Sequence, residues 1–464
     1  MYRLEVECLE GRAVPSVTNP TPVGLTPAQI QHAYGFDQIP ALAGNYNNAA
    51  GYGQTVAVVM AGDHPYIQSD LHAFDQAFGL PDPALVKLNQ AGSSTGPWPA
   101  VNASWAGEIA LDVEWSHAIA PAAKVVLVES RSANLADLAA AIDTARNYPG
   151  VSAVSMSWGL LQGPGMDAYE SHFTTPSGHA PVTFVAATLD NGLAYPSNLY
   201  WPSVSPKVLA VGGTSLTVLD GAGTYGSEVG WGASTGGVST YFAQPAYQQG
   251  VVTQTAAYRA IPDVSYHADN STKGFAVYDT VPTNRQTGWF NAYGDSAGAP
   301  QWAGLVALAN QQRAAGGLPT LDGATQTLPG LYALSKTSYG QDFHDVTTGA
   351  NGRYGAGAGY DLVTGLGTPK ADRLVPALAT LTGSGAAVAF PQPAAPAVTF
   401  SGTAQTAGGL AGATPRRVEV GGTPTALPPD RGPGWSISLA HAGRRTSSWE
   451  GDLFGPHDWV VDVG

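Results

Sequence analysis

The chain has 464 residues, a formal net charge of -14 and only 12% charged residues. This acidic balance argues against nucleic acid or an anionic membrane surface as a partner, and no run of about 18 apolar residues predicts a membrane span. With Cys8 as the single cysteine, no disulfide can form within the chain, so stability must come from the core and from any bound metal.

Composition divides the chain into three parts. Residues 1–24 form an N-terminal extension, whose first 16 residues contain three glutamates and lack the apolar centre of a signal peptide. Their pattern resembles a short leader of some exported bacterial proteins, which favours an extracellular or cell-surface location. Residues 25–382 have the texture of a folded domain. Residues 383–464 begin with a stretch rich in Ala, Pro, Gly and Thr, so we expect a linker and low-complexity tail there.

Apolar runs alternate with helical patterns through the first half of the folded part. A short helix is expected from Thr26 to Tyr34. Runs typical of buried parallel strands follow at 56–60, 124–128, 153–157, 182–187 and 208–212. Helical patterns lie at 67–78, 104–118 and 134–147, the last with Asn134 as its expected cap. This alternation predicts a parallel α/β sheet that is covered on both faces.

A serine turn, 294–298, leads into a further helix-like segment at 301–313. A serine in this position gains room for a substrate at its Oγ and nearby backbone N–H groups that favour negative charge. As Gly-Asp-Ser-Ala-Gly, the turn matches the elbow of α/β-hydrolase esterases, which also requires a buried strand before the serine. Residues 287–293 make a poor strand, so a serine peptidase competes with the esterase. The turn alone leaves a purely structural role equally open.

Three acids are candidates for chemistry. Glu108 and Asp112 lie at i and i+4 on one helix face, a spacing that does not stabilise a helix. Their small and apolar neighbours favour a buried face, where the two would share a proton, although two unrelated surface acids are the alternative. Glu114 lies off that face, and we expect it in solvent. Asp190 follows the apolar run 182–187 at the strand end where parallel sheets bind ligands, although Asp-Asn-Gly is also an ordinary turn.

An ordinary Ser-His-Asp triad has little support. None of the ten histidines lies in the His-Gly-Thr context of a subtilisin-type partner, and two of the three that follow Ser296 fall in the predicted tail. His64 and His117 remain as alternatives, but a structural role explains each better. A carboxylate base for Ser296 is the preferred interpretation.

Several motifs stand in an order that identifies a family. They are Glu108-x-x-x-Asp112, Ser155-x-Ser157-Trp158-Gly159, Asp190-Asn191-Gly192, Tyr195-Pro196, Val211-Gly212-Gly213-Thr214, Gly294-Asp295-Ser296-Ala297-x-x-Pro300, Asp345-Val346-Thr347, Gly359-Tyr360-Asp361 and Thr364-Gly365-Leu366-Gly367-Thr368-Pro369. In this order, region 25–382 resembles the sedolisin, or serine-carboxyl peptidase, family. The resemblance implies a subtilisin-like, doubly wound and mostly parallel sheet flanked by helices. It also implies a monomeric, acid-active endopeptidase that acts on polypeptides.

The resemblance assigns a role to each candidate. Ser296 would attack the scissile carbonyl, Glu108 would take its proton, and Asp112 would orient Glu108. Asp190, as a protonated acid, would donate a hydrogen bond to the oxyanion. The segment Ser157-Trp158-Gly159 would form the edge along which a peptide substrate pairs.

A calcium-binding loop is also implied by the resemblance. Its ligands would be the carboxylates of Asp345 and Asp361 and the backbone carbonyls of Val346, Gly357 and Gly359. Oxygen ligands of this kind suit Ca²⁺, a hard cation.

Two features depart from the family pattern. Asp295 stands next to the nucleophile, where the family usually has threonine, and an extra carboxylate there would alter the pH profile or impair acylation. Only residues 1–24 precede the resemblance, so the family's large N-terminal prosegment is expected to be missing. These departures motivate a third hypothesis beside the peptidase and the esterase, namely a non-catalytic peptide-binding relative.

Overall fold

A computed structural model of the chain describes residues 17–42, 44–192, 199–283, 285–383 and 386–387. The leader-like residues 1–16, the motif Tyr195-Pro196 and nearly all of the expected tail lie outside these ranges. Within the described part, no helix combines the length and the apolar character that a membrane crossing requires.

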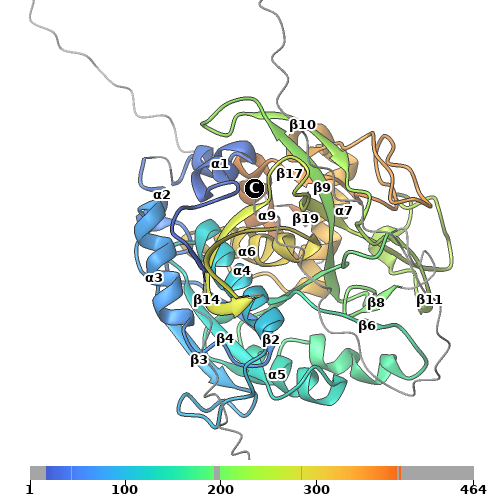
Figure 1. The fold of residues 1–464 in the computed structure, drawn as a ribbon. Coiled ribbons are helices and arrows are strands. Elements are labelled where there is room, and N and C mark those ends of the chain that lie inside the picture. Colours follow the sequence, from blue (N-terminus) through green and yellow to red (C-terminus); the bar gives the residue numbers. More distant parts are fainter. Residues whose placement is uncertain (1–16, 43, 193–198, 284, 384–385, 388–464) are drawn as a thin grey trace, which may run out of the picture. The chain divides into compact units, whose positions relative to one another are not determined.

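An eight-stranded sheet runs through the described part (Figure 1). Its strands are β2 Thr55–Ala61, β3 Leu85–Asn89, β4 Lys124–Ser130, β5 Val151–Met156, β7 Thr183–Ala187, β9 Val208–Val218, β10 Tyr225–Gly230 and β13 Val264–His267. Their order is β10-β9-β7-β5-β2-β4-β3, and β13 also pairs with β9. Every pair is parallel except β10 with β9. The predicted mostly parallel sheet is therefore confirmed, and all five apolar runs form strands in it.

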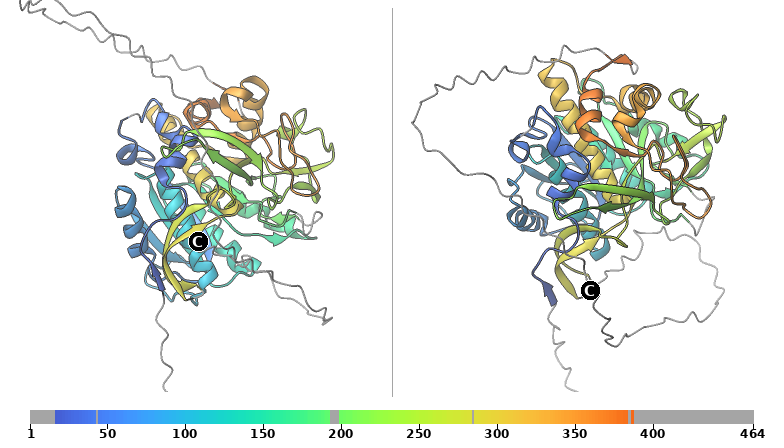
Figure 2. Two further views of the ribbon diagram at one scale, coloured as in Figure 1. Left: turned by 45° about the horizontal axis from the view of Figure 1, so that its top comes forward. Right: turned by 90° about the horizontal axis from the view of Figure 1, so that it is seen from above.

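Helices cover both faces of this sheet. They are α1 Pro27–Ala33, α2 Tyr46–Ala49, α3 Ile67–Phe78, α4 Ala103–Ile119, α5 Leu135–Asn147, α6 Gly298–Ala315, α7 Leu328–Thr337, α8 Tyr339–Asp342 and α9 Ala371–Ala379, with short turns η1 Phe36–Gln38, η2 Met166–Phe173, η3 Ala246–Gln248, η4 Asp295–Ala297 and η5 Gly323–Thr327. α4 packs against α6, and α5 lies on the other side of β2 and β4 (Figure 1). Both views in Figure 2 show α6, in yellow, between the blue N-terminal elements and the green and orange C-terminal ones.

Antiparallel strands form smaller sheets around this layer. They are β14 Phe275–Thr283 with β15 Gln286–Ala292 and the parallel β1 Val17–Asn19, β6 Leu160–Leu161 with β8 Tyr200–Trp201, β11 Gly237–Ala243 with β12 Tyr258–Ile261, β16 Phe343–His344 with β17 Thr368–Pro369, and β18 Leu381–Thr382 with β19 Ala386–Ala387. The low strand expectation for 287–293 was wrong, because these residues pair with β14 in a hairpin outside the main sheet. A hairpin that is buried on one face needs no continuous apolar run.

Helix α4 is the buried centre of the site region. The Asn102 side chain caps it by accepting a hydrogen bond from the Trp105 N–H at 3.1 Å. From Trp105 to Ile119 nearly every residue is buried, because β14, α3, α6 and the sheet surround the helix. Acids on this helix are therefore removed from water, which changes their protonation.

Two local expectations were wrong. Asn134 takes the N-cap position of α5, but its side chain makes no capping hydrogen bond. Glu114 is fully buried, not solvated, and its Oε2 accepts a hydrogen bond from the Tyr278 N–H at 3.1 Å. β14 covers this side of α4, and a hairpin more than 150 residues away in the chain leaves no mark on the helix sequence.

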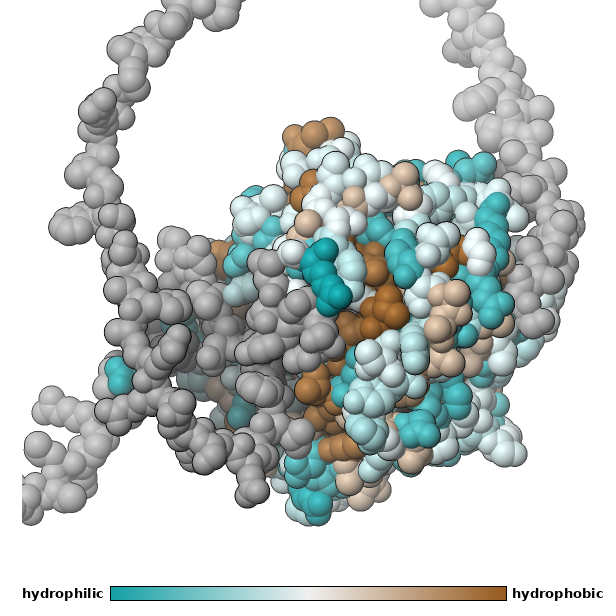
Figure 3. All heavy atoms as spheres, turned by 90° about the vertical axis from the view of Figure 1, so that its right-hand side faces the viewer, coloured by the Kyte–Doolittle hydropathy of each residue, from teal (hydrophilic) through white to brown (hydrophobic). Residues whose placement is uncertain are grey.

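On the face shown in Figure 3, apolar residues form a broken band between polar ones. Among the exposed large apolar side chains of the described surface are Leu161 in β6 and Tyr241 in β11. Scattered exposure of this kind is common on protein surfaces, so it carries no functional argument.

Candidate active site

Ser296 lies in turn η4, directly before α6, and is 6% exposed. The preceding Gly294 has φ 123°, a conformation that side chains rarely adopt. A Cβ on Gly294 would also lie 2.5 Å from Asp190 Oδ2. Glycine at this position therefore lets the carboxyl of Asp190 approach the serine turn.

The Ser157 hydroxyl joins the acid helix to the serine turn. Its Oγ lies 2.9 Å from Asp112 Oδ1 and 3.1 Å from the backbone carbonyl oxygen of Ser296. Its single hydrogen can be donated to only one of these oxygens at a time. The structure thus brings α4, the end of β5 and the serine turn together at one point.

Glu108 and Asp112 are both completely buried. Burial raises the pKa of Glu108 well above its ordinary value, the charges of Asp112 and Asp190 raise it too, and a hydrogen-bonding interaction with the Ser296 side chain lowers it. Neither oxygen of Glu108 makes a hydrogen bond of full geometry, so the Ser296 hydroxyl is near the carboxyl but not fully engaged. Burial also raises the pKa of Asp112, against the bond from Ser157. Two buried carboxyls of this kind share a proton.

Asp190 lies just beyond the end of β7. Its Oδ1 accepts a hydrogen bond from the Asp295 N–H at 2.8 Å, and its Oδ2 faces Gly294. Burial raises the pKa of Asp190 to about 7, although part of the residue remains open to solvent. Below that pH the acid is neutral and its O–H can donate a hydrogen bond beside the serine turn.

Asp295 is completely buried behind the serine. Its Oδ2 accepts hydrogen bonds from Thr188 Oγ1 at 2.7 Å and Ser234 Oγ at 3.0 Å, whereas its Oδ1 has no hydrogen-bond partner in the described part. Burial, and after it the charge of Asp190, raise the pKa of Asp295 well above its ordinary value. This residue therefore adds a second neutral carboxyl group beside Asp190, and not a permanent negative charge.

The segment Ser157-Trp158-Gly159 connects β5 to β6. The Trp158 side chain is buried, and its Nε1 donates a hydrogen bond to the Val59 carbonyl at 2.7 Å. A Cβ on Gly159 would lie 2.8 Å from side-chain atoms of Leu189 and Tyr200. Because these side chains are used inside the protein, only the backbone of the segment is suited to pairing with a peptide.

The two alternative histidines are engaged with acids of their own. His64 Nε2 lies 3.1 Å from Asp279 Oδ1, and His117 Nε2 lies 3.0 Å from Asp75 Oδ1. All four residues are buried. In the described part, neither histidine has a recorded hydrogen bond to Ser296, which agrees with a structural role for both.

His64, Asp70 and Asp279 form a buried cluster whose ligand atoms lie within 4.8 Å of one another. A metal at His64 Nε2 would require the proton on Nδ1, yet Nδ1 already accepts a hydrogen bond from the Tyr66 N–H at 3.2 Å. The proton belongs on Nε2, which donates to Asp279. The cluster is therefore a hydrogen-bonded one, and the sequence analysis missed it because its members are far apart in the chain.

The predicted calcium ligands lie in one loop between β16 and β17. Asp345 accepts a hydrogen bond from the Gly359 N–H at 3.2 Å, and Asp361 accepts one from the Gly357 N–H at 3.0 Å. Burial, then the charge of Asp345 and also that of Asp361, raise the pKa of Tyr339, so both carboxylates act on the same side chain. Two carboxylates in a glycine-rich loop with several carbonyls fit the oxygen ligands of Ca²⁺.

Comparison with known proteins decides the family. No family model matches the chain. It is 31% identical over 385 residues to kumamolisin of Bacillus sp. (strain MN-32), which covers 77% of this chain and 64% of that protein. It is 28% identical over 401 residues to sedolisin of Pseudomonas sp. (strain 101), which covers 77% and 62%. The structure of Pseudomonas sedolisin, a serine-carboxyl proteinase complexed with two molecules of pseudo-iodotyrostatin, aligns with a TM-score of 0.64 and 26% identity, over 76% of this chain and 98% of that one. The chain belongs to the sedolisin family.

Membership in the sedolisin family confirms the predicted resemblance and the subtilisin-like fold. The matched part spans less than two thirds of either relative, 64% of kumamolisin and 62% of sedolisin. The esterase interpretation of the serine turn does not fit this fold, because Ser296 follows an antiparallel hairpin and not a strand of the main sheet.

Proposed function

We propose that the chain is an endopeptidase that hydrolyses peptide bonds in acidic solution, with Ser296 as nucleophile and Glu108 as base. The observation that carries this proposal is the convergence of buried carboxyls on the serine turn, with Ser157 between Asp112 and the Ser296 carbonyl. The direct test is cleavage of a denatured protein in acid by the wild type and by Ser296→Ala.

The first chemical step is attack of Ser296 Oγ on the scissile carbonyl carbon. Glu108 in its ionised form takes the hydroxyl proton, and Asp112 holds Glu108 in place and shares its negative charge. The Glu108–Asp112 pair must therefore carry one negative charge before attack. Because burial raises both pKa values, this charge is lost as the pH falls, which sets the acid limit of activity.

The oxyanion that forms needs donors on its other side. Asp190 Oδ2 is suited to this role because Oδ1 is already held by the Asp295 N–H, and the Ser296 backbone N–H would act with it. The pKa of Asp190, about 7, gives the sign of the pH effect: the donor is present below this value and lost as the pH rises through it.

Collapse of the tetrahedral intermediate completes acylation. The C–N bond breaks, the proton on Glu108 passes to the leaving nitrogen, and the acyl group stays on Ser296 Oγ. Water then attacks the ester with Glu108 again as base, which releases the acid product and restores the serine. Throughout, the backbone of Ser157-Trp158-Gly159 would hold the peptide by main-chain hydrogen bonds.

Ca²⁺ is the proposed resident ion of the loop between β16 and β17. Asp345, Asp361 and the carbonyls of Val346, Gly357 and Gly359 would hold it, and its charge would close the loop against the folded domain. No step of the reaction uses it.

Removal of calcium should lower the melting temperature of the wild type. A ligand present at 100 times its Kd stabilises a folded protein by about 2.7 kcal/mol, and a chelator removes that stabilisation. Asp345→Asn should melt earlier and respond little to the chelator, whereas the exposed Asp220→Asn should behave as the wild type. An unchanged melting temperature of the wild type in the chelator would remove the calcium proposal.

A non-catalytic peptide-binding relative is the second candidate, and the buried Asp295 beside the nucleophile favours it. This candidate predicts that peptides associate with the protein but are cleaved at no pH. An extracellular location would suit an enzyme that works in acid, and detection of the native protein outside the cell would test it.

A further inference from the structure

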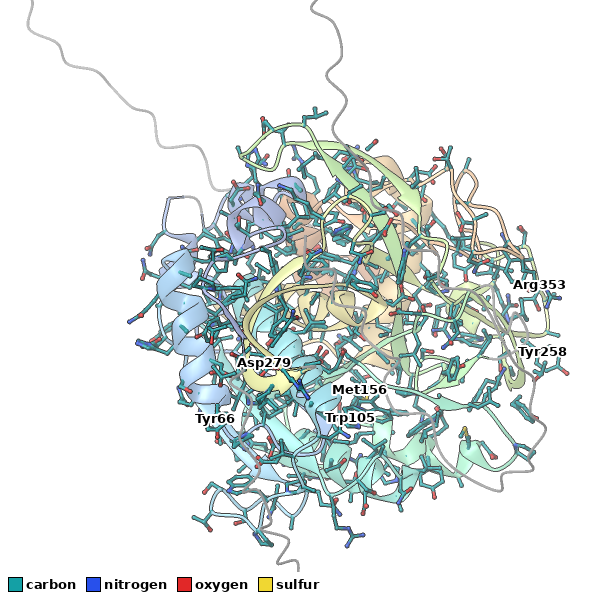
Figure 4. All side chains as sticks on the ribbon, in the orientation of Figure 1. Tyr66, Trp105, Met156, Tyr258, Asp279 and Arg353 are labelled. Atoms are coloured by element: carbon teal, nitrogen blue, oxygen red, sulfur yellow. The ribbon has the colours of Figure 1, made fainter. Side chains whose placement is uncertain are left out.

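An apolar cavity lies between α4 and the β14–β15 hairpin. α4 contributes Ala103, Gly107 and Leu111 to its walls, and the hairpin contributes Val277, Phe290 and Ala292. It encloses about 520 Å³, including its open mouth. Figure 4 locates the two sides by the labelled Trp105 on α4 and Asp279 on β14.

The cavity adjoins the proposed catalytic groups through the chain itself. Gly107 immediately precedes Glu108 on α4, and Tyr293, another lining residue, immediately precedes the serine turn at Gly294. Side chains of a peptide that reaches Ser296 must therefore pass its mouth.

The chemistry decides which part of the substrate is nearest. Glu108 returns its proton to the leaving nitrogen, so the leaving segment must lie on the Glu108 side of the cut bond. The segment that stays on the serine is assigned to the Ser157–Gly159 backbone at the end of β5. The cavity, on α4 and the hairpin, is thus on the leaving side.

The lining decides what side chain would fit. The walls expose mainly carbon, and the one carboxylate among them, Asp279, is 1% exposed and bound to His64 and to the Val281 N–H. A cation in the cavity would lose its water without gaining an unpaired carboxylate, whereas an apolar side chain gains by leaving water.

We propose that this cavity binds an apolar side chain of the residue immediately after the cleaved bond, and that Gly107 sets the size it accepts. This inference rests on the proposed peptidase function. A methyl group at Gly107 would lie 3.7 Å from Asp279 Oδ2, an ordinary contact, so glycine leaves space that a larger residue would fill. Aromatic and leucine side chains are therefore favoured over charged ones.

Peptides that differ only in the residue after the cut bond test this. The wild type should cleave the Leu and Phe peptides with kcat/KM about tenfold or more above that of the Lys and Asp peptides. Gly107→Val should lose about tenfold on the Phe peptide and little on the Ala peptide, because a filled cavity rejects only the larger side chain. Phe290→Ala, which removes the opposite wall, should weaken the preference for Phe.

Gly340→Val is the matched control, because Gly340 also lies in a helix but has open space around it. It should leave the preference unchanged. A wild-type preference for Lys, no preference at all, or a change in Gly107→Val confined to the residue before the cut bond would each overturn the inference while leaving the peptidase function standing.

Binding of the same peptides to Ser296→Ala separates the two proposals. If the wild type cleaves no peptide at any pH, the proposed function fails, and tighter binding of the Leu and Phe peptides would still support the cavity. Equal binding of all peptides would overturn the cavity assignment, whatever the cleavage result.

Discussion

Ser296→Ala should lower kcat by about 10⁴-fold or more, because no other group in the proposed mechanism can form the acyl intermediate. Glu108→Gln should lower kcat by about 10²- to 10⁴-fold, since an amide cannot accept the hydroxyl proton. Both should be measured in acid on a peptide substrate, with melting temperatures to verify folding. KM should change less than kcat, because neither group is assigned to binding.

Glu114→Gln is the control for this experiment. Glu114 is another buried acid of α4, but it bonds to the Tyr278 N–H and not to the serine turn. Its replacement should leave kcat close to that of the wild type. Wild-type rates in Glu108→Gln, or an equal loss in Glu114→Gln, would mean that Glu108 is not the base.

Asp190→Ala should lower kcat by about 10²- to 10³-fold through loss of an oxyanion donor. Asp190→Asn should retain more activity, because an amide can accept from the Asp295 N–H with its oxygen and donate to the oxyanion with its nitrogen. It should also keep its activity above pH 7, since an amide does not ionise, whereas the wild type loses the donor as Asp190 ionises near pH 7.

The shape of the pH profile is the deciding readout for Asp190. A loss in Asp190→Asn equal to that in Asp190→Ala, with the alkaline limb of the profile unmoved, would show that Asp190 does not act by donating a hydrogen bond. Asp112→Asn provides a comparison, because a change there should affect the acid limb.

Much of this site follows from local sequence. The spacing of Glu108 and Asp112 and their apolar neighbours indicated a shared, buried helix face, and the run before Asp190 indicated a strand end. Each inference uses residues within one or two turns or one strand, where periodicity reports burial directly. The structure agrees with the burial of all three elements.

Contacts made by the β14–β15 hairpin could not be predicted. The burial of Glu114, the cluster of His64 with Asp279, and the cavity at Gly107 all depend on strands that follow α4 by more than 150 residues. Pairing between distant segments leaves no periodic signal in either one, so only the fold brings these residues together.

Asp295 shows how the structure changes the meaning of a sequence departure. From the sequence, an extra carboxylate beside the nucleophile suggested an unfavourable charge. Its burial and its bonds from Thr188 and Ser234 instead favour a neutral acid, which adds no charge to oppose the oxyanion. The departure is therefore compatible with the proposed chemistry.

The pH dependence of kcat/KM for the wild type tests the central claim most directly. If a carboxylate deprotonates Ser296 and a neutral carboxyl donates to the oxyanion, the profile is a bell whose maximum lies on the acid side of pH 7, where Asp190 keeps its proton. A rate that instead rises through pH 6 to 7 and stays high in alkaline solution is the behaviour of a histidine base, with an ordinary pKa of about 6.5, and would contradict it.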